Sequence, residues 1–263
     1  MSGIGIIDRF LLTVRLAGVG IGKSIRKRLS KGNHGRTRRT LVLSYPKSGR
    51  TWLRTMLDDL GVRARYDHAE ANALYSAEKA FVPDTVDPSD IPERKVVLLL
   101  RDPRDILVSS YFEATKRQRV FSGTLSAFIR HPEFGIEPLL RFQGKWKRAA
   151  EQSDRFLVAR YEELLHDGVG TLGRIVSFVD QRHIPAQRIE STLKAFSFDR
   201  MKSMEKAGLL RVFYGKKLKA ADPGDTDSYK VRRGGAGGYA TYFSAEDTKY
   251  CRTWMKKLDS WYA

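Results

Sequence analysis

The chain has 263 residues but a single cysteine, Cys251, so it forms no disulfide within itself and no zinc site built from cysteines. It also lacks a run of about 18 apolar residues, the length that a membrane-spanning helix needs. Hydrophobic residues make up 41% of the sequence, which is too many for a disordered chain and enough for a packed core. These features predict one globular domain in a reducing, cytoplasmic environment.

Acidic residues are scarce: 30 Asp and Glu stand against 48 Lys and Arg, a formal net charge of +18. The excess is concentrated at the start, where residues 1–40 hold ten basic side chains and one acid, Asp8. A negatively charged partner is therefore expected. We treat residues 1–39 as a basic N-terminal extension and residues 40–263 as the folded domain. The extension either contacts an anionic membrane surface peripherally or is a solvated tail.

From residue 40 onward, short apolar runs alternate with segments of helical periodicity, which is typical of βαβ units around a parallel sheet. Residues 205–238 collect Gly, Lys, Arg and Asp without periodicity and predict a long loop. The fold class is thus α/β, one domain with a parallel sheet flanked by helices. Strands are expected over residues 41–45, 62–67, 96–100 and 156–159. Helices are expected over residues 51–60, 69–80, 103–116 and 171–179.

The segment from Tyr45 to Trp52 has the sequence Y-P-K-S-G-R-T-W and lies between a predicted strand and a predicted helix. Such a junction directs backbone N–H groups and the positive end of the helix toward one point, which favours an anion there. Gly49 allows the backbone to approach a ligand closely, and Lys47 adds a positive charge. The segment is no Walker loop, because G-x-x-x-x-G-K-[ST] is absent. The alternative is a plain turn without a ligand.

Two further segments carry positive charge where a ligand is expected. Arg101 directly follows the predicted strand 96–100, so its guanidinium can contact a phosphate in the crevice of an open sheet. Alternatively, Arg101 pairs with Asp105 at the start of the next helix. Arg232 and Arg233 precede the glycine-rich run 234–238, which either wraps an anion or forms a solvated loop.

Together and in this order, these segments resemble the PAPS-dependent sulfotransferase family of the cytosolic type, where PAPS is 3′-phosphoadenosine 5′-phosphosulfate. Residues 45–52 are similar to the family's Y-P-K-S-G-T-T-W, with Arg50 for the first Thr. Residues 101–109 resemble R-N-x-x-D-x-x-x-S, and residues 232–237 resemble R-K-G-x-x-G. Weaker similarities are Y-E-E at 161–163 for Y-E-D and S-F-D-R-M at 197–201 for S-F-x-x-M.

The resemblance covers about residues 40–255 and implies a P-loop-like sulfotransferase fold without a metal, in which PAPS lies across the carboxyl ends of the strands. Lys47 would bind the oxygen that bridges phosphorus and sulfur, and backbone N–H groups of residues 48–51 would hold the 5′-phosphate. The implied nucleotide contacts are Lys47, Ser48, Gly49, Arg50 and Thr51 with the 5′-phosphosulfate; Arg101, Ser109, Arg232, Arg233 and Gly234 with or beside the 3′-phosphate; and Trp52, Tyr161, Ser197 and Phe198 with adenine.

A neutral acceptor hydroxyl needs a base, and the resemblance implies a His at the end of the second strand, within the family's K-T-H. The segment here is Tyr66-Asp67-His68, so the Lys is absent and His68 is the candidate base, with Lys47 as the second catalytic residue. The alternative is that His68 only caps the following helix. If a carboxylate is the base instead, Asp67 and Glu70 are the candidates.

The sequence therefore predicts a sulfotransferase that moves the sulfuryl group of PAPS to an acceptor hydroxyl by in-line attack. The acceptor is a small molecule, a glycan or a lipid, and the basic surplus permits an anionic glycan or a lipid head group. Its contacts are expected in residues 75–93, 117–140 and 205–230, with core packing as the alternative for their aromatic side chains. Two competing hypotheses are a P-loop-like kinase, disfavoured by the missing Walker loop, and a nucleic-acid-binding protein, disfavoured because aromatics do not interleave with the basic clusters. The oligomeric state stays open.

Overall fold

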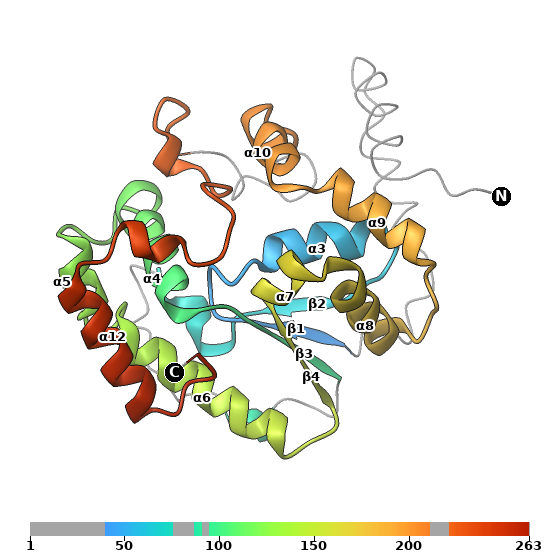
Figure 1. Cartoon of the computed structure of the whole chain (residues 1–263), viewed down its shortest axis with the longest axis horizontal. Coiled ribbons are helices and arrows are strands. Elements are labelled where there is room, and N and C mark those ends of the chain that lie inside the picture. Colours follow the sequence, from blue (N-terminus) through green and yellow to red (C-terminus); the bar gives the residue numbers. More distant parts are fainter. Residues whose placement is uncertain (1–39, 76–86, 91–94, 211–220, 263) are drawn as a thin grey trace.

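The computed structural model describes residues 40–75, 87–90, 95–210 and 221–262, and at its centre lies a sheet of four parallel strands (Figure 1). The predicted α/β fold with a parallel sheet is confirmed. The predicted extension 1–39 lies outside the described residues. The strands are β1 (Leu41–Leu43), β2 (Arg65–Asp67), β3 (Val96–Leu100) and β4 (Phe156–Arg160).

The strands lie in the order β2-β1-β3-β4, so the chain leaves β1 toward one side and later returns to its other side. Leu41 of β1 is in register with Arg65 of β2 and with Val96 of β3. In open parallel sheets, ligands bind where the strand order reverses, outside the carboxyl ends of the strands. The loops after β1 and β3 meet at this place, and they carry the first two predicted anion-binding segments.

Side chains of the strands alternate between the two faces of the sheet, and helices cover both faces (Figure 1). On β3, Val96, Leu98 and Leu100 are buried on one face, and Val97 and Leu99 on the other, which explains the unbroken apolar run of this strand. The first face is covered by α4 (Pro103–Phe112), α5 (Leu125–Ile129), α6 (Ile136–Glu151) and α12 (Ala245–Lys257). The second face is covered by α3 (Arg50–Asp59), α7 (Tyr161–His166), α8 (Gly168–Asp180), α9 (Ala186–Ala195) and α10 (Phe198–Lys206).

Two predicted helices differ from the structure. The segment 69–80 begins as a short 3-10 helix, η2 (Ala69–Ala73), and residues 76–86 lie outside the described part of the chain. The Asp67 carboxylate accepts hydrogen bonds from the N–H groups of His68 and Ala69 at 2.8 and 3.0 Å, and Ala69 has a φ of 47°, so this turn does not start as a regular α-helix. The segment 103–116 is α4 followed by a π-helical turn, η4 (Glu113–Arg117).

The segments predicted to contact the acceptor are partly structured. Residues 117–140 contain α5 and the start of α6, and Phe128 is buried there while Phe121 and Phe134 pack against the same core. Core packing is therefore the correct interpretation for these three rings; residues 211–220 lie outside the described part of the chain. Among the described residues, no helix has the length and apolarity to cross a bilayer. The short 3-10 helices are η3 (Pro88–Asp90), η6 (Thr226–Ser228) and η7 (Gly238–Thr241).

Candidate functional site

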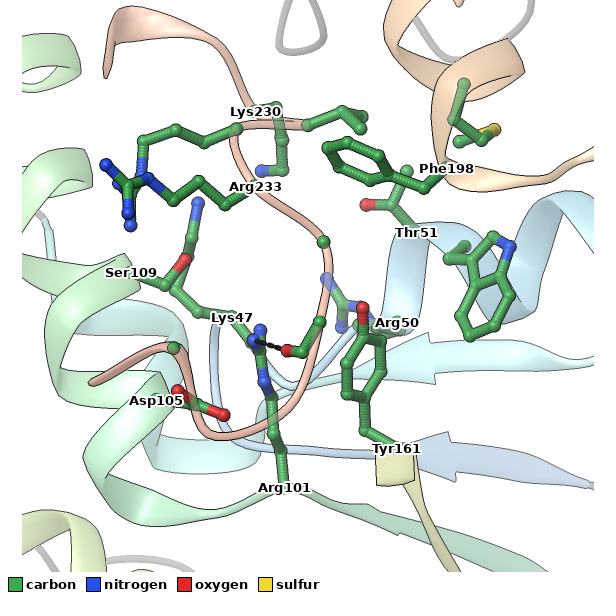
Figure 2. A pocket seen from close by; sticks show the side chains of 18 of the residues that line it. Lys47, Arg50, Thr51, Arg101, Asp105, Ser109, Tyr161, Phe198, Lys230 and Arg233 are labelled. Carbon is green, nitrogen blue, oxygen red and sulfur yellow. Dashed lines mark hydrogen bonds between the residues drawn. The ribbon is translucent and has the colours of Figure 1, made fainter. Parts of the chain in front are cut away.

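A cavity of about 330 Å³ opens at the carboxyl ends of β1 and β3 (Figure 2). Its walls come from the loop after β1, the starts of α3, α4, α7 and α10, and the loop that precedes η7. Of the predicted site residues, Ser48 and Ser197 are the two that do not line it. The predicted residues that line it are Lys47, Gly49, Arg50, Thr51, Trp52, His68, Arg101, Ser109, Tyr161, Phe198, Arg232, Arg233 and Gly234.

The loop after β1 presents the start of α3 to this cavity. Lys47 and Gly49 have φ angles of 72° and 92°, and a left-handed conformation is unusual for lysine. Gly49 is the N-cap of α3 and no side chain caps the helix, so its first-turn N–H groups have no partner within the helix. A Cβ at position 49 would lie 2.5 Å from the Tyr161 ring, so this position requires glycine for space as well as for conformation. The loop therefore has the geometry of an anion site.

The Lys47 ammonium forms an ion pair with Glu113 of η4, with 2.7 Å between Nζ and Oε2. Arg117 contacts the same carboxylate at 3.2 Å. Burial alone would raise the pKa of Glu113, but Lys47, Lys230 and Arg117 more than offset this and hold it well below its usual range. Glu113 and Lys230 were not predicted from the sequence. Glu113 lies 66 residues from Lys47, and no local pattern shows such a pairing.

Arg101 holds the loop after β1 and the glycine-rich loop together. Its Nη1 donates to the carbonyl of Lys47 at 3.1 Å, its Nη2 donates to the carbonyl of Gly235 at 3.0 Å, and its guanidinium lies 4.4 Å from the centre of the Tyr161 ring. Its Nε is buried and has no hydrogen-bond partner among the described residues. Because Arg101 bonds to backbone carbonyls, it does not form the alternative pair with Asp105.

Asp105 fixes the glycine-rich loop on α4. Its carboxylate accepts from the N–H groups of Gly237 and Tyr239 at 2.8 and 2.9 Å. Nearby, the Arg232 guanidinium stacks on the Phe112 ring of α4, 3.9 Å from its centre. The loop is thus held by α4 rather than free in solvent, contrary to the alternative of a solvated loop.

The same loop packs on α10, where Glu205 accepts from the N–H groups of Lys230 and Val231 and Gly234 lies against Phe198. Gly234 has a φ of 57°, and a Cβ at this position would lie 1.8 Å from the Phe198 ring. Any other residue here would displace Phe198 or the loop. Trp52 is fixed separately, because its indole N–H donates to the carbonyl of Phe196 at 2.7 Å. Both predicted adenine-binding rings therefore hold defined positions in the cavity wall.

His68 also lines the cavity, and its ring is held by a hydrogen bond of 2.6 Å between Nδ1 and the carbonyl oxygen of Ser44. A carbonyl only accepts, so Nδ1 carries the proton and Nε2 keeps its lone pair. Burial, and after it Arg50, lowers the pKa of His68 to about 3, so the imidazole is neutral at ordinary pH. The side chain does not cap η2. The two alternative bases are engaged elsewhere, Asp67 with backbone N–H groups and Glu70 with Lys145.

A family model, the sulfotransferase domain, matches residues 82–260, which is more than half of the chain. The chain belongs to the sulfotransferase family. The predicted enzyme class, a transferase that takes the sulfuryl group from PAPS, is confirmed, and the kinase and nucleic-acid-binding hypotheses are wrong. The family match begins after the loop 45–52, so that loop rests on its own motif and geometry.

Similar proteins agree with this family over most of the sulfotransferase. Sulfotransferase 2A2 of Mus musculus is 26% identical over 254 residues, which cover 83% of this chain and 83% of the relative. Cytosolic sulfotransferase 16 of Arabidopsis thaliana is 26% identical, covering 78% of this chain and 71% of the relative. The crystal structure of retinol dehydratase with androsterone and the inactive cofactor PAP superimposes with a TM-score of 0.59 at 20% identity, covering 85% of this chain and 81% of that one. The last likeness shows the fold.

No group of three or more His, Cys, Asp or Glu side chains in the described part of the sulfotransferase could hold a metal ion. The candidate site therefore offers cations and amide groups rather than metal ligands. An arrangement of this kind can bind a polyanion and stabilise charge that develops on a leaving oxygen. The binding and catalytic roles of the individual residues stay predictions.

Proposed function

We propose that the chain transfers the sulfuryl group of PAPS to an acceptor hydroxyl, with His68 as the general base. One observation carries the proposal: the uncapped start of α3, the cations Lys47 and Arg101, and a neutral imidazole line the same cavity. Such a cavity can bind a polyanionic donor through its cations and N–H groups, and its imidazole can accept a proton from the acceptor hydroxyl.

The residues fit a nucleotide with two separate anionic groups. The first-turn N–H groups of α3 and the Lys47 ammonium suit the 5′-phosphosulfate. At the other end, the partnerless Nε of Arg101 and the arginines 232 and 233 suit the 3′-phosphate, with Ser109 beside them. Trp52 and Phe198 would hold adenine between them. The retinol dehydratase structure contains PAP, which supports a bisphosphate nucleotide here.

Bound PAPS supplies a sulfuryl group on a phosphate leaving group, so the protein contributes position and charge more than covalent chemistry. Lys47 would exchange Glu113 for the bridging oxygen and stabilise the charge that develops there. His68 would accept the hydroxyl proton at Nε2, because Nδ1 is already protonated toward Ser44. Ser44 thus fixes both the tautomer and the direction of the ring.

The acceptor is proposed to be a hydroxyl compound. The related retinol dehydratase was solved with androsterone, which supports a hydroxyl-bearing ligand next to the nucleotide. The name of the Arabidopsis relative supports the predicted cytoplasmic location. Peripheral membrane contact through residues 1–39 is a separate proposal, to be tested by co-sedimentation with anionic vesicles.

The deciding experiment combines calorimetry with turnover. We expect the protein to bind PAP in preference to ATP with magnesium, and to transfer labelled sulfuryl from PAPS to a hydroxyl compound in an acceptor screen. His68→Gln should lower kcat by about 10²- to 10⁴-fold while the Kd of PAP is unchanged, because the base does not touch the nucleotide. The matched control His166→Gln, on the exposed end of α7, should behave as wild type. Wild-type turnover in His68→Gln would remove the base from the mechanism.

A further inference from the structure

Two cations of the cavity wall have side chains without an ion-pair partner among the described residues, and the proposed nucleotide contacts use neither side chain, only the backbone N–H of Arg50. They are Arg50, at the start of α3, and Lys230, in the loop between η6 and η7. Lys47 pairs with Glu113, Arg101 bonds to two carbonyls, and the arginines 232 and 233 bond to hydroxyl groups. Within the part of the chain that the structure describes, the side chains of Arg50 and Lys230 make no ion pair and no hydrogen bond with another side chain.

Arg50 serves the cavity in two ways. Its backbone belongs to the first turn of α3, where the 5′-phosphate is proposed to bind. Its side chain lines the cavity, and Asp67 and Tyr66 of β2 act on its charge. Nη1 is buried and has no hydrogen-bond partner among the described residues. Burial lowers the pKa of Arg50 to about 10, so it is still charged at neutral pH.

Lys230 reaches the cavity from the opposite side. Figure 2 shows the ends of Lys230 and Lys47 turned toward each other across the cavity, while Arg50 lies at the start of α3. Burial, and after it Lys47, lowers the pKa of Lys230 to about 8. Glu113 offsets this only in part, and a buried ammonium without an ion-pair partner is costly.

Two carboxylates act on the charges of this pair, Asp67 on Arg50 and Glu113 on Lys230, but among the described residues neither carboxylate forms an ion pair with them. Asp67 Oδ1 accepts from the N–H groups of His68 and Ala69. Glu113 is bound by Lys47 and Arg117, and Gln118 donates to it at 2.9 Å. Both cations also act on His68: burial is the main reason that its pKa is lowered, Arg50 and Lys230 lower it further, and Ser44 and Asp67 offset this in part.

We propose that Arg50 and Lys230 form an anion subsite beside His68, and that it binds a phosphate, sulfate or carboxylate group carried by the acceptor. The inference rests on the proposed function, since it takes His68 as the residue that meets the acceptor hydroxyl. The guanidinium supplies a planar pair of donors and the ammonium a point charge, which is a suitable set for an oxyanion. The substrate class is thus an anionic hydroxyl compound.

The first test uses inorganic phosphate as the minimal probe. Protein saturated with PAP is titrated with phosphate in a calorimeter, so that the nucleotide contacts are already occupied. We expect one additional phosphate site, with its Kd raised at least about tenfold in Arg50→Gln and Lys230→Gln. The controls Arg54→Gln, an exposed arginine one turn along α3, and Lys249→Gln, an exposed lysine of α12, should leave that Kd unchanged.

Each outcome of this titration decides a question. Absence of phosphate binding to the PAP complex overturns the subsite. Phosphate binding that is lost in Lys47→Gln but kept in the Arg50 and Lys230 variants also overturns it, because the anion would then occupy the sulfuryl position. Absence of PAP binding refutes the proposed function instead. Thermal unfolding of every variant with and without PAP separates loss of the subsite from loss of the fold.

The second test measures substrate preference. Matched acceptor pairs, such as 4-hydroxyphenylacetate and its neutral amide, differ in charge but hardly in shape. With PAPS saturating, we expect kcat/KM to favour the anionic member at least about tenfold, through a lower KM, and the double variant Arg50→Gln/Lys230→Gln to lose that preference. Equal or better use of the neutral members, or an equal loss of kcat with both members in the variant, overturns the proposal.

Discussion

The ion pair between Lys47 and Glu113 gives the most specific prediction. Substituting Glu113→Gln removes the carboxylate that pairs with Lys47 and Arg117 and whose charge also interacts with Lys230. At 2.7 Å and an effective dielectric constant of about 20, the attraction between one pair of charges is about 6 kcal/mol. Much of this is offset by desolvation, and breaking a buried pair by removing one partner costs about 3–5 kcal/mol. For a chain of this size the melting temperature of the unliganded variant should fall by about 6–20 °C.

PAP should then rescue the variant more than the wild type. The freed cations repel one another in the empty cavity and attract a polyanion, so we expect the Kd of PAP to fall by about tenfold and the rise in melting temperature on adding PAP to be larger in Glu113→Gln. Thermal unfolding with and without PAP measures both effects. The control Glu137→Gln breaks an exposed pair with Arg141 and should cost less than about 1 kcal/mol. Equal melting temperatures for the two variants, or weaker PAP binding in Glu113→Gln, would refute the reasoning.

Three further predictions test the loop, the base and the glycine-rich segment. Gly49→Ala forces a Cβ into the Tyr161 ring and should weaken PAP binding by about tenfold or more, as measured by calorimetry. The control Gly61→Ala, with a φ of 71° but open space around the Cβ, should lower the free energy of unfolding and leave PAP binding unchanged. Because the pKa of His68 is lowered to about 3, kcat/KM should not fall as the pH is lowered from about 8 to 5.5, and an acid limb near the ordinary pKa of histidine, lost in His68→Gln, would contradict this. Asp105→Ala releases two backbone N–H groups of the glycine-rich loop, so the Kd of PAP should rise by about 5- to 50-fold with little change in kcat.

The sequence predicted those parts of the site that depend on local structure. Neighbours in the chain determine three of these parts: the apolar run of β3, the strand–loop–helix junction at residues 45–52, and the position of Arg101 after a strand. Parallel strand order then brings the loops after β1 and β3 to one edge, so their convergence follows from the fold class. For this reason thirteen of the fifteen predicted residues line one cavity.

Glu113 and Lys230 could not be found in this way. Glu113 lies at the end of α4, where an acid four residues before Arg117 predicts an exposed pair on a helix surface. The π-helical turn and the contact with Lys47 are properties of the folded chain. Lys230 lies in a segment without periodicity, and its place in the cavity depends on Glu205 of α10, whose carboxylate accepts from the N–H groups of Lys230 and Val231 at 2.7 Å each. The predicted helix at 69–80 failed for a local reason, because the Asp67 carboxylate takes the first N–H groups of that turn.

The strand order also assigns a direction to the proposed chemistry. β1 lies between β2 and β3, so the loop that ends in Gly49 has Arg101 on one side and His68 on the other. A nucleotide held by Arg101 must lie along the β1–β3 side, which leaves the β2 side for the acceptor. Arg50 lines the same cavity, and its charge is acted on by Asp67 and Tyr66 of β2. In the proposed arrangement the same residue of α3 serves the donor through its backbone and the acceptor through its guanidinium, so we expect an arginine at this position to favour acceptors that carry negative charge.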